Sequence, residues 1–599
     1  MKNTALVAGR IDVKAEVRHD GSVILSNGLP LPEIEGTIPG RLRHWADKTP
    51  EALFLTQESR ELRYGEAERI RRGLASRLVG LRLTGDRPLM IVADNGIDHA
   101  LLMLAATSIG VPVAIVSPSY VAPGARPWTK FARIADQITP ALVVTDAPAL
   151  VGEALAASSV EAAVHDISDN AWLLQYPEHG SAEVDEAERS VGLDSVAKLL
   201  FTSGSTGAPK AVPNTQRMMV SNMLGLSAVW PFLSERPPVS VDWLPWNHTF
   251  GGNCCFNTTL WFGGHSHIDS GRPTPGAILR SVAALRKWRP NLYYNVPVGF
   301  EAIMPFLEGD ADFAGPFLGE LDFVFNGGAP MPPALRSRLE AVALRTIGRS
   351  LHIVAGWGAT ETAPFSTVLY FDQPHANNLG APMPGTRVKM VPSDERFELR
   401  VKGPNVMPGY WRDPMATEAA FDEEGFYKIG DAAKFANSGD PSEGILFDGR
   451  VAENFKLTSG TWVNVGALRL AVVSAMEKLV SDTVVAGEGR GDIRLLLFPN
   501  EVACRALLRA VECQEPTDVS VGAHPKVRAR IAELLRAYND RQMGSSTRIA
   551  GFIILDEPPS PDHDEINDKG YINQRKVLSR RPAVLEKLYS RESALDQDA

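Results

Sequence analysis

The chain has 599 residues, a formal net charge of -10 and a composition of 44% hydrophobic and 22% charged residues. A chain of this length is too long to fold around one ordinary hydrophobic core, so we predict two or more domains. The composition is typical of a soluble globular protein. Lysine and arginine are not concentrated in any segment, so nucleic acid is not an expected partner. The acidic balance also means that an anionic substrate must be held by local donors.

Other bulk features point to a cytoplasmic protein. Its four cysteines are too few for a disulfide-dense secreted scaffold, and we expect them to be small buried side chains. The first 21 residues carry scattered charges and no apolar core, so we do not expect a signal peptide. No apolar run approaches the length of a membrane span, so no membrane association is expected. The sequence leaves open whether the chain forms a homodimer.

The first clear unit lies between Pro88 and Ser117. An apolar run, an apolar helix-length segment and a second apolar run predict strand, helix and strand within 30 residues. Such a βαβ unit implies a parallel sheet covered by helices, and hence an α/β fold.

Three further apolar runs follow the same pattern, at Ala197–Phe201, Asp322–Phe325 and Leu351–Ala355. Each is followed at once by a loop rich in Gly, Ser, Thr or Pro. In an open α/β sheet, ligands bind beyond the carboxyl ends of the strands. We therefore expect the chemistry in these loops.

The composition changes near residues 447–450. Beyond this point, two short strands and the amphipathic helix Val527–Tyr538 indicate a small α+β domain. The prediction is a large N-terminal domain, residues 1–449, with parallel and mixed sheets flanked by helices, and a small mobile C-terminal domain, residues 450–599. Residues 1–35 are expected to be loosely held.

The most informative loop follows the strand at Ala197–Phe201. It supplies four hydroxyls, two glycines and a lysine, which can surround an anion with donors and charge. It is not a Walker A loop, because two residues separate its last glycine from the lysine. Its members are Thr202, Ser203, Gly204, Ser205, Thr206, Gly207, Ala208, Pro209 and Lys210.

At these residues the chain resembles the adenylate-forming superfamily of acyl-CoA synthetases, peptide-synthetase adenylation domains and luciferases. The resemblance implies a mobile loop that grips the β- and γ-phosphates of ATP. It extends to a loop that lines the adenine and to a second motif after the Leu351 strand. The residues concerned are Gly328, Ala329 and Pro330 in the first, and Gly356, Trp357, Gly358, Ala359, Thr360 and Glu361 in the second.

The resemblance also assigns individual roles. Trp357 packs on adenine, Thr360 touches the α-phosphate, and Glu361 holds Mg2+ alongside Thr206, a combination of oxygen ligands that suits this ion. Further along, Asp431 accepts the ribose hydroxyls. Arg450 is a second ligand for ribose and phosphate.

Two motifs depart from the pattern of the superfamily. Its hinge residue, usually Asp or Lys, falls on Ala452. Its C-terminal lysine motif is altered, so that Lys569 is the candidate for the lysine that neutralises charge at the α-phosphate, and Lys576 is the rival. Ser459 and Gly460 would line the tunnel for the pantetheine arm of coenzyme A.

The acyl pocket is expected near Leu244–Gly252, where His248 either steers the carboxylate or packs beside Phe250. Tyr294, Val298 and Gly328 would complete it, and their aromatic and small side chains suit a flat aromatic acid. Three longer stretches, in the βαβ unit, after Asp448 and around Lys569, resemble the bacterial feruloyl-CoA synthetase subfamily.

This resemblance implies an AMP-forming acid–CoA ligase that uses ATP, Mg2+ and coenzyme A, with a hydroxycinnamic acid (ferulic, coumaric or caffeic) as substrate. A benzoate or fatty acid, or a carrier protein in place of coenzyme A, is the nearest alternative. A non-catalytic nucleotide-binding module would not need Glu361, Asp431, Arg450 and a C-terminal lysine together. An ADP-forming ligase would need a phosphohistidine in a phosphate loop, and we identify no candidate.

Overall fold

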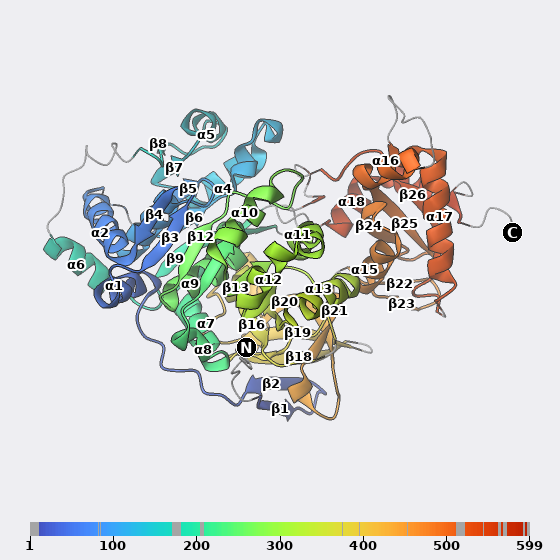
Figure 1. Ribbon diagram of the computed structural model, residues 1–599, viewed down its shortest axis with the longest axis horizontal. Coiled ribbons are helices and arrows are strands. Elements are labelled where there is room, and N and C mark those ends of the chain that lie inside the picture. The colour runs from blue at the N-terminus through green and yellow to red at the C-terminus, as the bar shows by residue number, and fades with distance from the viewer. Residues whose placement is uncertain are drawn as a thin grey trace. The chain divides into compact units, whose positions relative to one another are not determined.

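The computed structural model describes residues 11–595 except 82, 84, 170–180, 204–208, 374, 394–395, 452, 511–520, 543, 561–562, 564, 567–571 and 591–592. The chain divides into two compact units (Figure 1). Unit 1 holds Met1–Pro392, Leu399–Ile429 and Phe435–Leu446, and unit 2 holds Ser393–Glu398, Gly430–Lys434 and Phe447–Ala599. Within the described residues, no helix is both long and apolar enough to cross a bilayer.

A mixed six-stranded sheet contains the predicted βαβ unit, and the prediction is confirmed: β5 and β6 pair in parallel and are joined by α3. Nearly every side chain of α3 is buried, which explains why its sequence is apolar on most faces. The strand order and bounds are β10 (Pro209–Thr215), β9 (Val196–Ser203), β6 (Val113–Ile115), β5 (Leu89–Val92), β7 (Leu142–Thr145) and β8 (Ala163–Asp166), with α3 at Ile97–Ser108.

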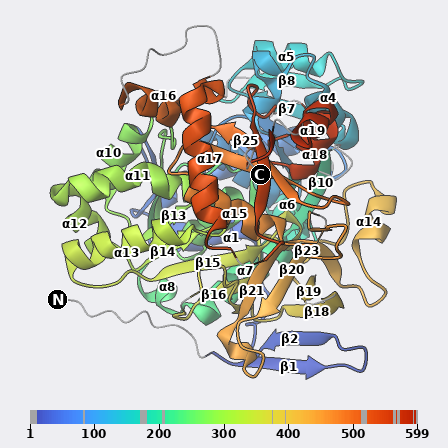
Figure 2. The same ribbon diagram turned by 90° about the vertical axis from the view of Figure 1, so that its right-hand side faces the viewer.

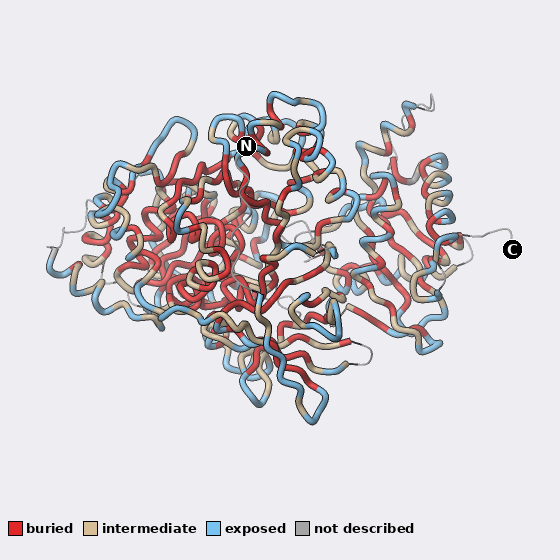
Figure 3. The backbone as a smooth tube through the Cα atoms, turned by 60° about the horizontal axis from the view of Figure 1, so that its bottom comes forward, coloured by how far each residue is buried: buried red, intermediate tan, exposed pale blue. Residues whose placement is uncertain are grey.

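One face of this sheet is covered by α4 (Thr129–Ile138) and α5 (Pro148–Leu155). Phe131 of α4 and Val151 of α5 belong to one buried cluster with Met90 of β5. Every residue of β5 and of β7 is buried, and Figure 3 shows buried residues gathered in the interior and exposed ones toward the outside. Burial of apolar area of this kind is the main source of stability for such a sheet.

A second sheet combines parallel and antiparallel pairing, and the helices α10–α13 pack on it through one hydrophobic cluster. The predicted strands at Asp322 and Leu351 belong here, whereas the strand at Ala197 is in the first sheet. The bounds are β13 (Leu292–Asn295), β14 (Phe323–Asn326), β15 (Ile353–Gly358), β16 (Phe365–Leu369), β17 (Ala381–Pro382), α10 (Ile278–Trp288), α11 (Pro297–Gly309), α12 (Ala311–Glu320) and α13 (Pro333–Ile347).

Unit 1 also contains a four-stranded sheet and its flanking helices. Its strand order is β11, β12, β3 and β4, and α1 packs on α2 and α9. The strands of this sheet are β11 (Val239–Asp242), β12 (His265–Ile268), β3 (Leu53–Gln57) and β4 (Arg60–Arg63). The remaining α-helices of unit 1 are α1 (Ile38–Lys48), α2 (Tyr64–Gly80), α6 (Ser181–Ser190), α7 (Gln216–Val229), α8 (Phe232–Glu235), α9 (Phe256–Trp261) and α14 (Pro414–Ala420).

The expectation that residues 1–35 are loosely held is wrong for residues 13–27. They form a hairpin whose second strand pairs with β18, so backbone hydrogen bonds to a distant part of the chain hold the segment in place. The sheet comprises β1 (Val13–Val17), β2 (Val23–Asn27), β18 (Arg387–Ser393), β19 (Arg396–Lys402), β20 (Tyr427–Phe435) and β21 (Ile445–Arg450). The boundary between the two units runs through its last strands.

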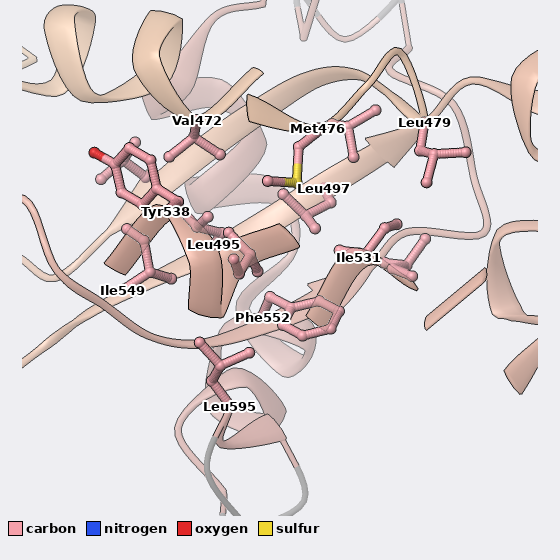
Figure 4. Packing of buried hydrophobic residues seen from close by; sticks show 14 of the residues in the cluster. Val472, Met476, Leu479, Leu495, Leu497, Ile531, Tyr538, Ile549, Phe552 and Leu595 are labelled. Atoms are coloured by element: carbon pink, nitrogen blue, oxygen red, sulfur yellow. The ribbon is translucent and has the colours of Figure 1, made fainter. Parts of the chain in front are cut away.

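Unit 2 is built on a three-stranded sheet with its own core, in which Leu495, Ile531 and Phe552 are buried (Figure 4). The predicted amphipathic helix is α17, which Figure 2 shows in front of the sheet. The bounds are β22 (Phe455–Lys456), β23 (Trp462–Val463), β24 (Val480–Ala486), β25 (Ile493–Pro499), β26 (Ile549–Ile554), α15 (Val465–Ala475), α16 (Glu501–Ala510), α17 (Pro525–Asn539), α18 (Gln574–Arg580) and α19 (Pro582–Leu588).

Candidate active site

The predicted phosphate loop lies at the end of an antiparallel hairpin formed by β9 and β10. In the register, Ser203 is opposite Pro209 and Thr202 is opposite Lys210. The strand therefore continues two residues beyond Phe201, where the sequence analysis ended it, because pairing with β10 gives these polar residues backbone partners. The remaining members of the predicted loop (Gly204, Ser205, Thr206, Gly207 and Ala208) lie outside the described residues.

The second nucleotide motif begins inside a strand rather than in a loop. Gly356, Trp357 and Gly358 are the last residues of β15 and pair with β16. A Cβ at Gly356 would lie 2.4 Å from the Phe365 ring, and one at Gly358 would lie 1.9 Å from the Pro364 carbonyl oxygen. These glycines therefore permit the close approach of β16, a structural requirement that the sequence motif alone does not reveal.

Glu361 lies in the 3-10 turn Thr360–Thr362 that follows Ala359 and is only 6% exposed. Its Oε1 accepts hydrogen bonds from the Tyr410 hydroxyl at 3.0 Å and from the Thr202 hydroxyl at 3.4 Å. The Asn214 side chain donates to the Thr360 carbonyl at 3.2 Å. The structure thus brings the β9–β10 hairpin of the first sheet against the Glu361 turn, which lies between β15 and β16 of the second sheet.

Sequence reasoning missed Tyr410. Besides its bond to Glu361, its ring lies 4.7 Å from the Lys210 ammonium, measured to the ring centroid. Burial and the neighbouring Glu361 raise the pKa of the Tyr410 phenol, so it remains a proton donor at neutral pH. The available signal was a Tyr-Trp pair beside a glycine in a loop, which is weak without the structure.

The segment that carries Tyr410 is fastened at two places by backbone hydrogen bonds. The Met407 amide donates to the Glu361 carbonyl at 2.9 Å, and the Trp411 amide donates to the Ala211 carbonyl in β10 at 2.9 Å. Because Ala211 and Glu361 belong to the two sides of the candidate site, this segment holds both sides together.

The predicted adenine loop follows β14. Gly328 has a φ of +79°, a conformation that favours glycine, and the Asn326 side chain donates to the Ala329 carbonyl at 2.8 Å. Pro330 is partly buried beside it, and Trp357 is buried in β15. Their contacts with a nucleotide remain predictions.

Aromatic rings gather at the predicted acyl pocket. Phe250 begins the π-helix Phe250–Cys255, and its ring centroid lies 6.3 Å from that of Tyr294 and 5.6 Å from that of Phe325. A Cβ at Gly327 would lie 2.6 Å from the Phe250 ring, so the ring packs directly on the backbone next to Gly328.

The other two side chains of the predicted acyl pocket, His248 and Val298, are less buried than the rings of Phe250 and Tyr294. The His248 carbonyl accepts a hydrogen bond from the Gly252 amide at 2.8 Å, which places His248 at the base of the π-helix. Val298, near the start of α11, is 52% exposed, unlike the buried rings of Phe250 and Tyr294. An apolar side chain so exposed is available to a ligand, and its role stays a prediction.

In unit 2, Asp431 and Arg450 form an ion pair. The Arg450 Nε lies 3.0 Å from Asp431 Oδ1, and the arginine side chain is 54% exposed whereas the aspartate side chain is 7% exposed. The two residues predicted to bind ribose are therefore neighbours, as a shared ligand would require.

The predicted coenzyme A residues form the turn of the β22–β23 hairpin. Gly460 has a φ of +81° with open space beside its α-carbon, and the Ser459 hydroxyl donates to the Thr461 hydroxyl at 2.9 Å. Ala452 and Lys569 lie outside the described residues. The rival Lys576 lies in the first turn of α18, where its amide donates to Asn573. The choice between the two lysines stays open.

Comparisons with known proteins identify the family. The AMP-binding enzyme model matches residues 42–411. Feruloyl-CoA synthase of Amycolatopsis sp is 31% identical over 412 residues, covering 66% of this chain and 75% of the relative, and anthranilate–CoA ligase of Pseudomonas aeruginosa is 28% identical, covering 65% and 71%. The structure of the anthranilate CoA ligase AuaEII in complex with anthranoyl-AMP has a TM-score of 0.69 at 15% identity, covering 92% of this chain and 99% of that one. The match over more than half of the chain shows that this protein belongs to the AMP-binding enzyme family.

Proposed function

We propose that the protein is an AMP-forming acid–CoA ligase. A carboxylate oxygen attacks the α-phosphorus of ATP, the bond from that phosphorus to the bridging oxygen breaks, and pyrophosphate leaves. The sulfur of coenzyme A then attacks the acyl carbon, AMP leaves with the bonding electron pair, and the thiol proton passes to solvent. The observation that carries this proposal is that Thr202 of β9 and Tyr410 both donate to Glu361, while the Tyr410 ring also contacts the ammonium of Lys210 in β10.

The first step needs positive charge rather than a base, because the attacking carboxylate is already ionised. Lys210 would supply part of that charge. Lys569 or Lys576 of unit 2 would supply more at the α-phosphate. Asp431 and Arg450 would hold the ribose through the carboxylate and the guanidinium.

The residues around Glu361 fit a magnesium ion. Its described partners are neutral hydroxyls, which leaves its negative charge for a cation. The resemblance names Thr206, four residues after Thr202 in the sequence, as the second ligand. Among the described residues no cluster of three or more His, Cys, Asp or Glu side chains could hold a metal alone. Magnesium commonly binds through one or two carboxylates plus substrate phosphates, and it would neutralise charge on the phosphate oxygens.

For the acid, we favour an aromatic substrate of the hydroxycinnamate class, such as ferulate, coumarate or caffeate. The rings of Phe250 and Tyr294, together with the glycines at 327 and 328, offer flat apolar surfaces at the predicted acyl pocket. Two relatives named above act on ferulate and anthranilate, both of them aromatic acids.

A panel of cinnamates, benzoates and fatty acids tests the proposal. Purified protein with ATP, Mg2+ and each acid should exchange labelled pyrophosphate into ATP, and added coenzyme A should convert the acid to its thioester with release of AMP. Exchange with a hydroxycinnamate but acyl transfer only to a carrier protein would identify the alternative acceptor. Absence of exchange with every acid would refute the proposed reaction.

A further inference from the structure

Lys198 is a buried lysine that the reaction described above does not use. It lies in β9, four residues before Thr202, and is 2% exposed. Its ammonium donates to the Gly252 carbonyl at 2.7 Å and to the Asn253 side-chain oxygen at 3.1 Å. Both acceptors are neutral, and burial lowers the pKa of Lys198 to about 7.

A buried amine held by neutral acceptors is costly, because an ammonium loses most of its hydration in the interior. An apolar side chain in β9 would avoid that cost, as its neighbour Leu199 does in the same strand. Side chains whose pKa is strongly shifted by burial are concentrated at functional sites. The contacts of Lys198 therefore need an explanation beyond the packing of the sheet.

Both acceptors belong to the π-helix Phe250–Cys255. π-helices are rare and are frequently found at functional sites. This one packs tightly on the preceding loop: a Cβ at Gly251 would lie 2.5 Å from the Leu244 carbonyl oxygen, and one at Gly252 would lie 2.4 Å from the Trp246 carbonyl oxygen. The helix therefore contacts the preceding loop through its glycines and contacts Lys198 through Gly252 and Asn253.

The contact continues from the π-helix to the Glu361 turn. The Asn253 amide donates to the Asn214 side-chain oxygen and to the Thr249 hydroxyl. The Asn214 amide in turn donates to the Thr360 carbonyl. Lys198, Asn253 and Asn214 thus form a continuous buried hydrogen-bonded series between the helix that carries Phe250 and the residue next to Glu361.

We propose that Lys198 is a positioning residue for the acid substrate, because it fixes the π-helix that presents Phe250 and so sets the distance between the acyl pocket and the Thr360–Glu361 turn. This inference rests on the proposed function. Lys198 acts through Phe250 and has no contact with reacting atoms. Its loss should therefore weaken acid binding more than ATP binding, since Glu361 keeps its own bonds to Tyr410 and Thr202.

The test compares Lys198→Met with the wild-type full chain by acid-dependent pyrophosphate exchange. We expect the acid KM to rise about tenfold, with the ATP KM and kcat each within about threefold of wild type. Asn253→Ala should produce a smaller rise of the same kind, because it keeps the Gly252 contact. The double variant should have an acid KM close to that of Lys198→Met alone, because the effects of two substitutions within one hydrogen-bond network are not additive.

Thr56→Val is the matched control. Its fully buried hydroxyl bonds to His265 and His267 on the adjacent strand of the four-stranded sheet, so its removal disturbs a buried polar cluster that contains neither Lys198 nor Asn253. It should lower thermal stability and leave the acid KM unchanged. If Lys198→Met does not fold, Asn253→Ala alone decides the question.

The inference is overturned if the folded variants have the wild-type acid KM. It is also overturned if the KM of both substrates and kcat change in parallel, as general loosening of the fold would cause. Either result leaves the proposed function intact, because the wild type still exchanges pyrophosphate. Lack of exchange by the wild type itself would refute the proposed function instead.

Discussion

Two buried carboxylates, one in each unit, have similar exposure and opposite surroundings. Glu361 of unit 1 is 6% exposed and accepts hydrogen bonds from the hydroxyls of Tyr410 and Thr202. Asp431 of unit 2 is 5% exposed and pairs with the guanidinium of Arg450. The first is thus held by neutral donors, and the second by a cation.

The difference indicates different tasks for the same chemical group. A carboxylate oriented by hydroxyls keeps its full charge for a cation that arrives with the substrate. A carboxylate already paired with arginine is neutralised, so it is better suited to accept hydrogen bonds from uncharged hydroxyls. We expect Glu361 to act in chemistry and Asp431 in binding, and four experiments can break or sharpen this contrast.

The largest effect is expected for Glu361→Gln. The amide keeps the shape but loses the charge that would hold the ion, so pyrophosphate exchange should fall by about 100- to 1000-fold in kcat. Chelation of magnesium should abolish exchange by the wild type. Glu340→Gln, which removes one charge from a partly exposed i,i+4 pair on α13, is the control and should change neither rate nor KM. A Glu361→Gln enzyme with wild-type activity would contradict the assigned role.

Asp431→Asn should act on ATP affinity. The change removes the negative charge that pairs with Arg450 and weakens acceptance of hydroxyl donors, so the ATP KM should rise by about 10- to 100-fold while the acid KM stays within about threefold. Arg217→Gln, which breaks an exposed pair with Asp194, is the control. An effect on kcat as large as that of Glu361→Gln would remove the contrast between the two carboxylates.

Gly460→Leu tests whether the turn of the β22–β23 hairpin affects only the acyl transfer to coenzyme A. Thioester formation should fall about tenfold or more, and pyrophosphate exchange should persist, because only the thiol arm would pass this turn. Since Gly460 has a φ of +81°, part of the effect could come from backbone strain. Gly460→Asn tolerates that conformation and should be nearly wild type. Gly348→Leu, at a φ of +69° with open space in unit 1, gives the cost of strain alone. Equal loss of both half-reactions in Gly460→Leu would contradict the prediction.

The smallest effect is expected for Tyr410→Phe. It removes one hydrogen bond to Glu361 and leaves Thr202 and the ring over Lys210, so the loss of about 0.5–1.5 kcal/mol should lower kcat roughly two- to tenfold. Single-turnover rates of adenylate formation measure it directly. A loss as large as that of Glu361→Gln would mean that Tyr410 itself contacts the reacting groups.

Much of the fold could be predicted because local patterns and tertiary structure agree. The βαβ unit around α3 and the helix α17 are examples in which apolar periodicity is strong and each element is buried as its pattern requires. The hairpin at residues 13–27 could not be predicted, because its stability depends on pairing with β18, more than 350 residues away.

The candidate site was predictable only where a contiguous motif carries it. Thr202 and Glu361 lie in such motifs, and the structure places them in hydrogen-bond contact. Tyr410, Asn253 and Lys198 belong to no contiguous pattern, and their relevance follows from which strands lie next to one another. Sequence periodicity contains no information about such long-range neighbours.

The double fastening of the segment around Tyr410 has a practical consequence. The amides of Met407 and Trp411 donate hydrogen bonds to the two sides of the candidate site, yet neither residue belongs to a motif expected to touch substrate. Exchange of these amides with deuterium should slow when bound nucleotide and acid stabilise both sides of the site, and should become faster when a substitution destabilises either side. The exchange rates of these two backbone amides thereby report occupancy of the site without any turnover.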